Sequence, residues 1–452
     1  MEPASCSEDE FYDACETEDQ IALYQRSATM QYNPEPIPLK SNFLTISVEN
    51  PPSNLLRSYT EAIFPISNPS PTEELPVIIE NPKPQSIVLI DYNVEYKTTK
   101  KDSLEFNNLQ FLQEIDLPHK ESNIICVAKF SLDSRMFAVA GSNGKIMIFD
   151  INSSADGILS NDPSHILTEH AGPVTDISWG KENNLLSSSA DKTVKMWVQG
   201  RLNSMETVQH PCEVNSVCYN PMDSNYFVTA TKDMIIRLFK LPEKVIEGFY
   251  QAPGEISCLC YSPSGEFLAV GADKGQVLLY QGRFDYKLRL GATLLCRNRR
   301  GLKSGGKRVT GLEFIDNDHL CVTTNDSNIR LYRYKENLLL QKFKGTENIK
   351  YPIRSSLSED GEYLLCGSEK GRIYIWNTMK SSEMPGKNNF FESFYPRKKR
   401  CTEYALFAPR KIVDLVQAGI ENDLLEIKHV IFTVGSKQNI RIFVNQRSLE
   451  NN

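Results

Sequence analysis

A repeated sequence pattern constrains the fold of this chain more than any other feature. Residues 256–280 (ISCLCYSPSGEFLAVGADKGQVLLY) and residues 353–376 (IRSSLSEDGEYLLCGSEKGRIYIW) share one order of features. Each copy has an alternating apolar run, a turn, a second apolar run, another turn and a third run that ends at an aromatic residue. Alternating apolar residues favour β-strands, and Gly beside Asp or Ser favours tight turns. Each copy therefore predicts three antiparallel strands.

Further copies cover residues 124–149, 174–197, 214–239 and 309–332, and a divergent last copy covers residues 403–443. The copies end at Phe149, Trp197, Phe239, Tyr280, Tyr332, Trp376 and Phe443. The shortest spacings between these aromatic residues, 42 and 41, resemble the roughly 40–45-residue period of WD40 repeats. The longer spacings predict insertions. Seven such units predict an all-β fold, a seven-bladed WD40 β-propeller of four-stranded sheets with short, protected edges.

The chain divides into four segments by composition. We expect an acidic tail at residues 1–20, a mostly disordered linker rich in Pro, Ser and Asn at residues 21–107, a propeller at residues 108–446 and a short tail at residues 447–452. Residues 109–117 (LQFLQEIDL) alternate just before the first repeat. We expect this strand to pair with the last blade and close the ring, because an unpaired edge there would favour aggregation.

The second repeat keeps the most polar residues of the WD40 pattern. His170, Asp191 in the turn SSSADKTV, and Trp197 stand where WD40 repeats place a buried hydrogen-bonded network. A buried carboxylate needs donors around it, and the imidazole and the hydroxyls of residues 187–189 are suited to supply them. The alternative interpretation is a catalytic His–Asp pair. We favour the structural network.

No catalytic or cofactor-binding motif is present. The sequence has no GxxxxGK[ST], GxSxG or HExxH motif, and its six histidines are dispersed. The eleven cysteines form no CxxC pair, no run of 18 apolar residues occurs, and the formal net charge is −7. We therefore expect a monomeric, cytoplasmic protein that is not an enzyme, with no cofactor, metal, nucleic acid or transmembrane segment.

The acidic N-terminal tail carries a short motif. Residues 7–19 read SEDEFYDACETED. This stretch resembles the two-phenylalanines-in-an-acidic-tract (FFAT) motif, which implies binding to VAP receptors of the endoplasmic reticulum. Glu10, Phe11, Tyr12, Asp13, Ala14 and Glu16 occupy the positions of the motif. Tyr12 is the single departure, since the motif has a second phenylalanine there. The alternative is a solvated acidic tail in which two aromatic residues are adjacent by chance.

The propeller resembles the family of WD repeat-containing protein 44, rabphilin-like Rab-binding effectors of recycling endosomes. The resemblance covers roughly residues 109–445. It rests on residues 185–197, 298–311 and 323–334, together with Asn220-Pro221 and Tyr226-Phe227. It implies an endosomal or Rab-linked partner, to which we assign no residues.

Basic residues concentrate in two segments between repeats. The first contains Arg297, Arg299, Arg300, Lys303, Lys307 and Arg308, with Gly305 and Gly306 among them. Flexible glycines beside cations suit an anionic lipid or an acidic protein, and a solvated loop is the equal alternative. The second, Arg397–Arg400, is either a nuclear-import signal or a surface loop.

The sequence as a whole predicts a non-catalytic adaptor in membrane trafficking that links the endoplasmic reticulum to endosomal membranes. Its tail would bind a VAP receptor, and its propeller or linker would bind endosomal or Rab-linked partners. The alternative is a WD40 substrate receptor of a ubiquitin ligase, or a nuclear assembly scaffold, with an incidental acidic tail.

Overall fold

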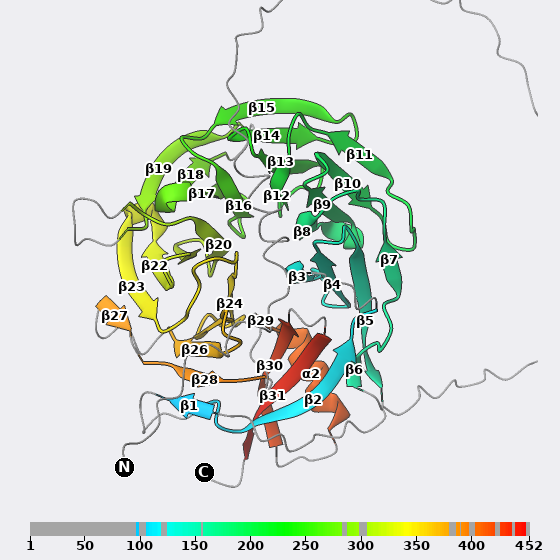
Figure 1. Cartoon of the computed structure of the whole chain (residues 1–452), viewed down its shortest axis with the longest axis vertical. Coiled ribbons are helices and arrows are strands. Elements are labelled where there is room, and N and C mark those ends of the chain that lie inside the picture. The colour runs from blue at the N-terminus through cyan, green and yellow to red at the C-terminus, as the bar shows by residue number, and fades with distance from the viewer. Residues whose placement is uncertain are drawn as a thin grey trace, which may run out of the picture. The chain divides into compact units, whose positions relative to one another are not determined.

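Seven small sheets are arranged around a central axis, as the repeats predict (Figure 1). The computed structural model describes residues 96–98, 105–118, 124–154, 157–282, 287–297, 305–378, 386–388, 390–396, 403–420, 425–435 and 439–448. Within these residues the first strand of each blade lies nearest the axis (Figure 1). The predicted seven-bladed propeller is confirmed.

The first four blades follow the chain in order, and their strands have these bounds. Blade 1 contains β3 (Ile125–Phe130), β4 (Met136–Gly141), β5 (Ile146–Ser154), β6 (Gly157–Leu159) and β7 (His165–Leu167). Blade 2 contains β8 (Val174–Trp179), β9 (Leu185–Ser189), β10 (Thr193–Trp197) and β11 (Glu206–Gln209). Blade 3 contains β12 (Val214–Tyr219), β13 (Tyr226–Thr231), β14 (Ile235–Lys240) and β15 (Val245–Gln251). Blade 4 contains β16 (Ile256–Tyr261), β17 (Phe267–Ala272), β18 (Gln276–Gln281) and β19 (Arg289–Leu295).

The last three blades include strands from distant parts of the chain. Blade 5 contains β20 (Val309–Phe314), β21 (His319–Thr324), β22 (Asn328–Arg333), β23 (Leu338–Lys344) and the parallel β27 (Gly386–Asn388). Blade 6 contains β24 (Ser355–Leu357), β25 (Tyr363–Cys366), β26 (Ile373–Asn377), β28 (Glu392–Phe394) and β1 (Tyr96–Thr98). Blade 7 contains β29 (Glu403–Phe407), β30 (Leu425–Gly435), β31 (Asn439–Ser448) and β2 (Leu109–Asp116). The short 3-10 turns are Lys181–Asn183, Asp273–Gly275 and Tyr334–Glu336.

The aromatic residue that ends each repeat lies on the third strand of its blade. Trp197 and Trp376, for example, are 2% and 1% exposed. The fourth strand lay outside the sequence pattern because it is half exposed and lacks a regular apolar alternation, as β15 shows. The repeats therefore marked the three inner strands of every blade.

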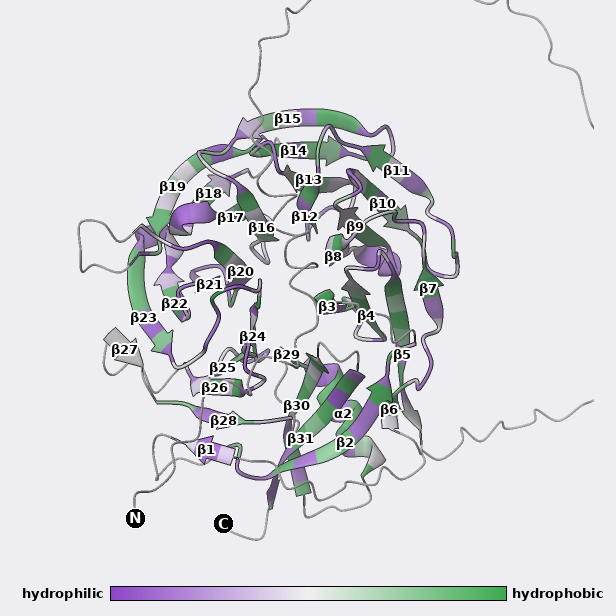
Figure 2. Ribbon diagram, in the orientation of Figure 1, coloured by the Kyte–Doolittle hydropathy of each residue, from purple (hydrophilic) through white to green (hydrophobic). Residues whose placement is uncertain are grey.

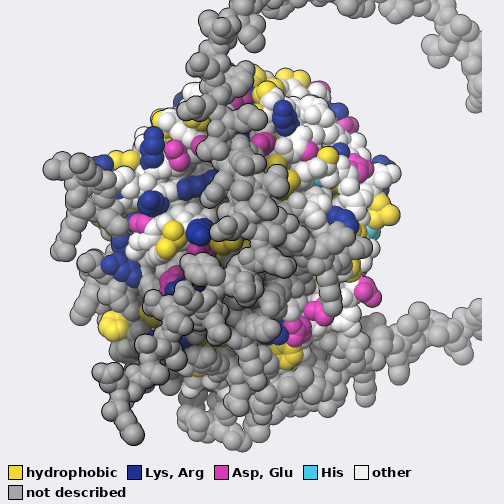
Figure 3. Space-filling model, viewed as in Figure 1, with side chains coloured by type: hydrophobic (Ala, Val, Ile, Leu, Met, Phe, Trp, Pro, Cys, Tyr) yellow, Lys and Arg dark blue, Asp and Glu magenta, His cyan; other side chains and the backbone are white. Residues whose placement is uncertain are grey.

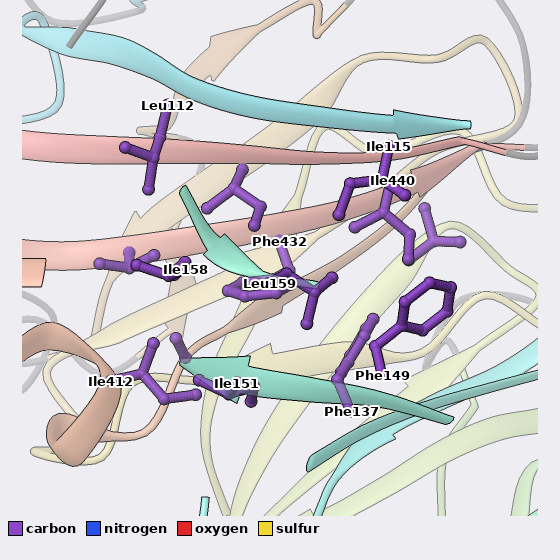
Figure 4. Close-up of a cluster of buried hydrophobic side chains, with 14 of the residues drawn as sticks. Leu112, Ile115, Phe137, Phe149, Ile151, Ile158, Leu159, Ile412, Phe432 and Ile440 are labelled. Carbon is purple, nitrogen blue, oxygen red and sulfur yellow. The ribbon is translucent and has the colours of Figure 1, made fainter. Parts of the chain in front are cut away.

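Hydrophobic cores fill the spaces between neighbouring blades. Among the described residues, a separate cluster joins each of the seven pairs of neighbours. The largest lies between blades 7 and 1, where Phe432 of β30 packs on Phe137 of β4 (Figure 4). Because each blade contributes to two cores, it depends on both neighbours for the burial that stabilises it.

Strand β2 closes the ring, as the sequence predicts. It pairs antiparallel with β31, with Phe111 opposite Phe443 and Ile115 opposite Ile440. The Gln113 side chain then joins blade 7 to blade 1, since its Nε2 donates to the Leu159 carbonyl at 2.7 Å. Strand β2, which precedes the first repeat, and β31, the third strand of the last repeat, are thereby held in one sheet.

Several described parts of the chain lie outside the sequence pattern. Phe106, within the segment expected to be linker, is 1% exposed and packs on Tyr363 with a ring distance of 5.1 Å. Helix α2 (Arg410–Gly419) fills part of the longest repeat spacing and buries Ile412, Val413 and Val416 in the core between blades 7 and 1. Strand β31 also extends to Ser448, two residues beyond the expected end of the propeller.

Candidate functional site

Blade 2 brings His170, Asp191 and Trp197 together. The Nδ1 of His170 lies 2.8 Å from Oδ2 of Asp191, and its Nε2 lies 2.7 Å from Oγ of Ser187. Trp197 donates from Nε1 to the same Ser187 oxygen at 2.8 Å. Both imidazole nitrogens are occupied and the ring is fully buried. This burial favours a structural network over the catalytic His–Asp pair, because neither imidazole nitrogen is free to exchange a proton with a substrate.

Hydrogen bonds hold Asp191 as a carboxylate. Burial alone would raise its pKa, but the hydrogen bonds from His170 and Thr193 outweigh burial and hold the pKa below its usual range. Thr193 contributes both its backbone N–H at 2.9 Å and its hydroxyl at 2.7 Å. The network therefore fixes the turn between β9 and β10.

Blades 3 and 5 fix the same turn with arginine. In blade 3 the Nη2 of Arg237 lies 2.6 Å from Oδ2 of Asp233. In blade 5 the Nη2 of Arg330 lies 2.5 Å from Oδ2 of Asp326, and Nη1 donates to Thr324 at 2.6 Å. The repeats predict turns at these places but not the arginines that hold them. The signal is a repeated Asp-x-x-x-Arg spacing.

The first basic segment joins the outer strand of blade 4 to the inner strand of blade 5. Arg297, Lys307 and Arg308 are exposed, whereas Arg299, Arg300 and Lys303 lie outside the described residues. The nearest acidic partner of Arg308 is Glu255 at 3.9 Å, with both side chains 44% exposed, so that pair adds little stability. Figure 3 shows basic side chains over blades 4 and 5, interspersed with acidic ones.

Packing explains one glycine of this segment. A Cβ on Gly306 would lie 2.1 Å from the Lys274 carbonyl oxygen, whereas a Cβ on Gly305 would meet nothing within 4 Å. The close approach that Gly306 permits is therefore to the turn between β17 and β18 rather than to a ligand. Asn325 N–H also donates to the Arg308 carbonyl at 3.0 Å, which anchors the end of the segment.

A cluster of charged residues at the central axis had no counterpart in the sequence interpretation. Asp176 of β8 is completely buried. Its Oδ1 lies 3.1 Å from Lys129 Nζ of β3 and 3.0 Å from Arg354 Nη1, at the start of the inner strand of blade 6. Ser216 of β12 donates to Oδ2. We call these four residues the axial cluster; it joins blades 1, 2, 3 and 6.

The charges of the axial cluster are mutually dependent. Burial would raise the pKa of Asp176, but Arg354 and then Lys129 outweigh burial and lower it. Another inner-strand carboxyl, Glu313 of β20, has no such cation beside it in the described part of the chain: burial raises its pKa to about 8, and one hydrogen bond from the Leu357 N–H only partly opposes this. At neutral pH Asp176 is therefore charged, whereas burial favours the neutral form of Glu313.

Several residues singled out from the sequence lie outside the described part of the chain. They include the tail motif, Glu10, Phe11, Tyr12, Asp13, Ala14 and Glu16, and the basic run 397–400. Within the described residues no group of three or more His, Cys, Asp or Glu side chains is placed to hold a metal ion. No helix among the described residues is long and apolar enough to cross a membrane.

Comparison with protein families gives a match to the family described as WD domain, G-beta repeat. The matched residues are 111–150, 161–198, 203–240, 244–281 and 339–377. The first four matches each begin near or within the outer strand of one blade and end with the third strand of the next. The family repeat is therefore offset from the blade by one strand, as expected of a ring closed by β2.

Three curated relatives show how far the similarity extends. WD repeat-containing protein 44 of Xenopus laevis is 31% identical over 249 residues, 53% of this chain and 27% of that protein. An uncharacterized WD repeat-containing protein of Schizosaccharomyces pombe is 31% identical over 216 residues, 46% and 36% of the two chains. The E3 ubiquitin-protein ligase COP1 of Pisum sativum is 26% identical over 288 residues, 60% and 40%. The aligned regions thus span less than half the length of each of these relatives.

Proposed function

This chain is a WD40-repeat protein, and we propose that it is a non-catalytic adaptor that links the endoplasmic reticulum to endosomal membranes. A propeller of this kind is a rigid protein-interaction scaffold, and the function of such a scaffold depends on what it binds. The proposal therefore depends on two contacts, one at the N-terminal tail and one on the propeller or linker. The protein would be cytoplasmic and peripheral to both membranes.

The tail sequence is the observation that carries the proposal. Phe11 and Tyr12 stand in a tract that holds eight acidic residues and no Lys or Arg among its first twenty positions. An acidic lead is attracted to a basic groove over a Debye length of about 8 Å at physiological salt. Burial of Phe11 adds roughly 1.5–3 kcal/mol. A VAP-type receptor is the partner that this combination fits.

The propeller is the second contact. Its similarity to WD repeat-containing protein 44 supports an endosomal or Rab-linked partner. The basic segment with Arg297, Lys307 and Arg308 exposed supports an anionic partner on the same propeller. The predicted linker is shortened to about 75 residues, because β1 and Phe106 belong to the propeller. As a flexible chain it would have an r.m.s. length of roughly 50 Å, so both contacts could be made together and each would raise the effective concentration for the other.

Titration calorimetry tests the tail contact. A peptide of residues 1–24 is titrated into a VAP receptor domain, and we expect micromolar binding that Phe11→Ala abolishes. Tyr24→Ala in the same peptide is the control, because Tyr24 lies outside the motif. Absence of binding by the native peptide would reduce the tail to a solvated acidic leader.

A ubiquitin-ligase substrate receptor is the second candidate. The similarity to COP1 over 60% of this chain favours it. In that case the propeller alone selects the partner, and deletion of residues 1–20 leaves the set of co-purifying proteins unchanged. In the adaptor, the same deletion removes the VAP receptor from that set.

A further inference from the structure

The axial cluster holds more hydrogen-bond donors than its acceptors can use. Asp176 Oδ1 already accepts from Lys129, from Arg354 and from the Ile177 N–H, and Oδ2 accepts from Ser216. Lys129 Nζ has one further acceptor, the Ile177 carbonyl at 2.6 Å. Arg354 has five N–H groups. Its Nε is buried without an acceptor among the described residues.

The charge of the cluster is also unbalanced. Two cations face one carboxylate, so the cluster carries one excess positive charge. The Lys129 and Arg354 side chains are 35% and 24% exposed, although Asp176 beneath them is completely buried. Solvent therefore reaches the cations at the axis.

The sequence makes room for Arg354 at this position. A Cβ on Gly311 of β20 would lie 3.1 Å from the Arg354 Cβ, which is tighter than an ordinary contact. Glycine at 311 thus lets the arginine of blade 6 lie over blade 5 and extend to Asp176 of blade 2. A glycine in a strand weakens it, so a close approach of this kind is a reason for its presence.

Exposed cations stand at the same end of the ring. Arg308 directly precedes β20 and Arg354 directly precedes β24, so both lie where neighbouring inner strands begin. The exposed Lys274, Arg297 and Lys307 belong to the turn and the loop beside Arg308. Glu255, the partner of Arg308, stands at the same end, so an acidic segment approaching it is attracted by the other exposed cations and then by the axial cluster.

We propose that the axial cluster receives a carboxylate from an acidic peptide segment of a protein partner. Lys129 and Arg354 would donate to it together, and one added carboxylate neutralises the excess charge. A bilayer surface does not fit, because inner strands surround the axis and a flat surface cannot enter, whereas a flexible side chain can. This inference rests on one part of the proposed function, namely that the propeller binds a protein partner. It adds that the partner carries an acidic segment.

Binding of a fluorescein-labelled hexaglutamate peptide to the full chain tests the proposal. We expect measurable anisotropy binding at low salt that weakens at least tenfold in Arg354→Gln. The matched control is Arg135→Gln, which removes the same charge from a side chain that is 84% exposed and lies in the turn before β4. Binding by this control should stay within twofold of the native chain. Arg308→Gln, at the rim, should weaken binding only two- to threefold.

Three outcomes overturn the proposal. One is no binding by the native chain, and another is equal binding by Arg354→Gln, which would locate the contact on the basic segment alone. The third is a chain that ignores hexaglutamate but binds phosphoinositide vesicles through Arg354. If Arg354→Gln fails to fold, Lys129→Gln replaces it, because Lys129 is the more exposed cation. Calorimetry with residues 1–24 tests the other end of the adaptor, so the two failures remain distinguishable.

Discussion

Blades 2 and 3 begin with the same residue and use it differently. His170 and His210 each stand four positions before the inner strand of their blade. In blade 2 both nitrogens of His170 are bonded, to Asp191 and to Ser187. The histidine there is the donor that makes a buried turn carboxylate tolerable.

In blade 3 an arginine, not the histidine, donates hydrogen bonds to the turn aspartate. Arg237 pairs with the turn carboxylate of Asp233, and His210 keeps one bond, from Nε2 to Thr229 at 3.0 Å. Its Nδ1 is buried with no partner of normal geometry among the described residues, although the Val208 carbonyl is near enough to matter electrostatically. In these two blades the histidine bonds to the turn aspartate only where no arginine does.

Blade 5 completes the comparison, because it has the arginine and no histidine. Arg330 is 1% exposed and donates from Nη1 and Nη2 to Asp326, which also accepts from the Thr324 hydroxyl. Burial would raise the pKa of Asp326, but the hydrogen bonds and charge of Arg330 lower it below the usual range. A guanidinium therefore suffices for this turn without an imidazole.

The largest expected effect follows from removing that guanidinium. Arg330→Met should lower the free energy of unfolding by about 3–5 kcal/mol, because Asp326 is left as an unpaired, largely buried charge. Urea denaturation monitored by tryptophan fluorescence measures the loss. Arg333→Met is the control, since Arg333 is 43% exposed and its pair with Glu336 should contribute under 1 kcal/mol. A loss below 1 kcal/mol for Arg330→Met would contradict the view that arginine replaces the blade 2 network.

The same comparison shows what the sequence could predict. Trp197 and His170 were found because blade 2 keeps the residue types of the WD40 pattern at the expected places. Arg237 and Arg330 were missed because a charged residue inside an apolar strand reads as an interruption of the alternation. Only the partner four residues earlier explains it, and that pairing repeats in two blades.

The axial cluster could not be predicted from the sequence for a different reason. Lys129, Asp176 and Arg354 are separated by 47 and 178 positions, and each looks like an isolated polar residue in or beside a strand. Ring closure places their blades around one axis, so the contact depends on the whole fold. Helix α2 was missed because it fills an insertion within the least regular repeat.

Acidification should lower the stability of the chain through His210 of blade 3. Burial, then the charge of Arg237, lowers the pKa of His210 to about 4. The unfolded histidine has a pKa of about 6.5, so the unfolded chain binds the proton first as the pH falls. Stability from this group is complete above about pH 6.5 and is lost towards pH 4. At pH 5 we expect a loss of about 2 kcal/mol relative to pH 7, measured by urea denaturation.

His210→Gln is the control for this pH dependence. It removes the titrating group and keeps a polar side chain near Thr229, so the native chain should lose more stability between pH 7 and pH 5 than the variant. Part of the loss will remain, because burial also lowers the pKa of His429 to about 4. An identical pH dependence in both chains would mean that protonated His210 is accommodated in the folded chain by a hydrogen-bond acceptor.

The smallest effect concerns the aromatic residue at which the repeat ends, on the third strand, Trp197 in blade 2 and Phe239 in blade 3. Trp197→Phe gives blade 2 the aromatic residue of blade 3 and removes the hydrogen bond from Nε1 to Ser187. We expect a loss of about 1 kcal/mol. A double-mutant cycle of Trp197→Phe, Ser187→Ala and the variant with both changes isolates this bond. If the two side chains are coupled, the double variant loses less stability than the sum of the two single losses. Additive losses would show that Trp197 contributes only volume, and blades 2 and 3 would then differ only in how each holds its aspartate.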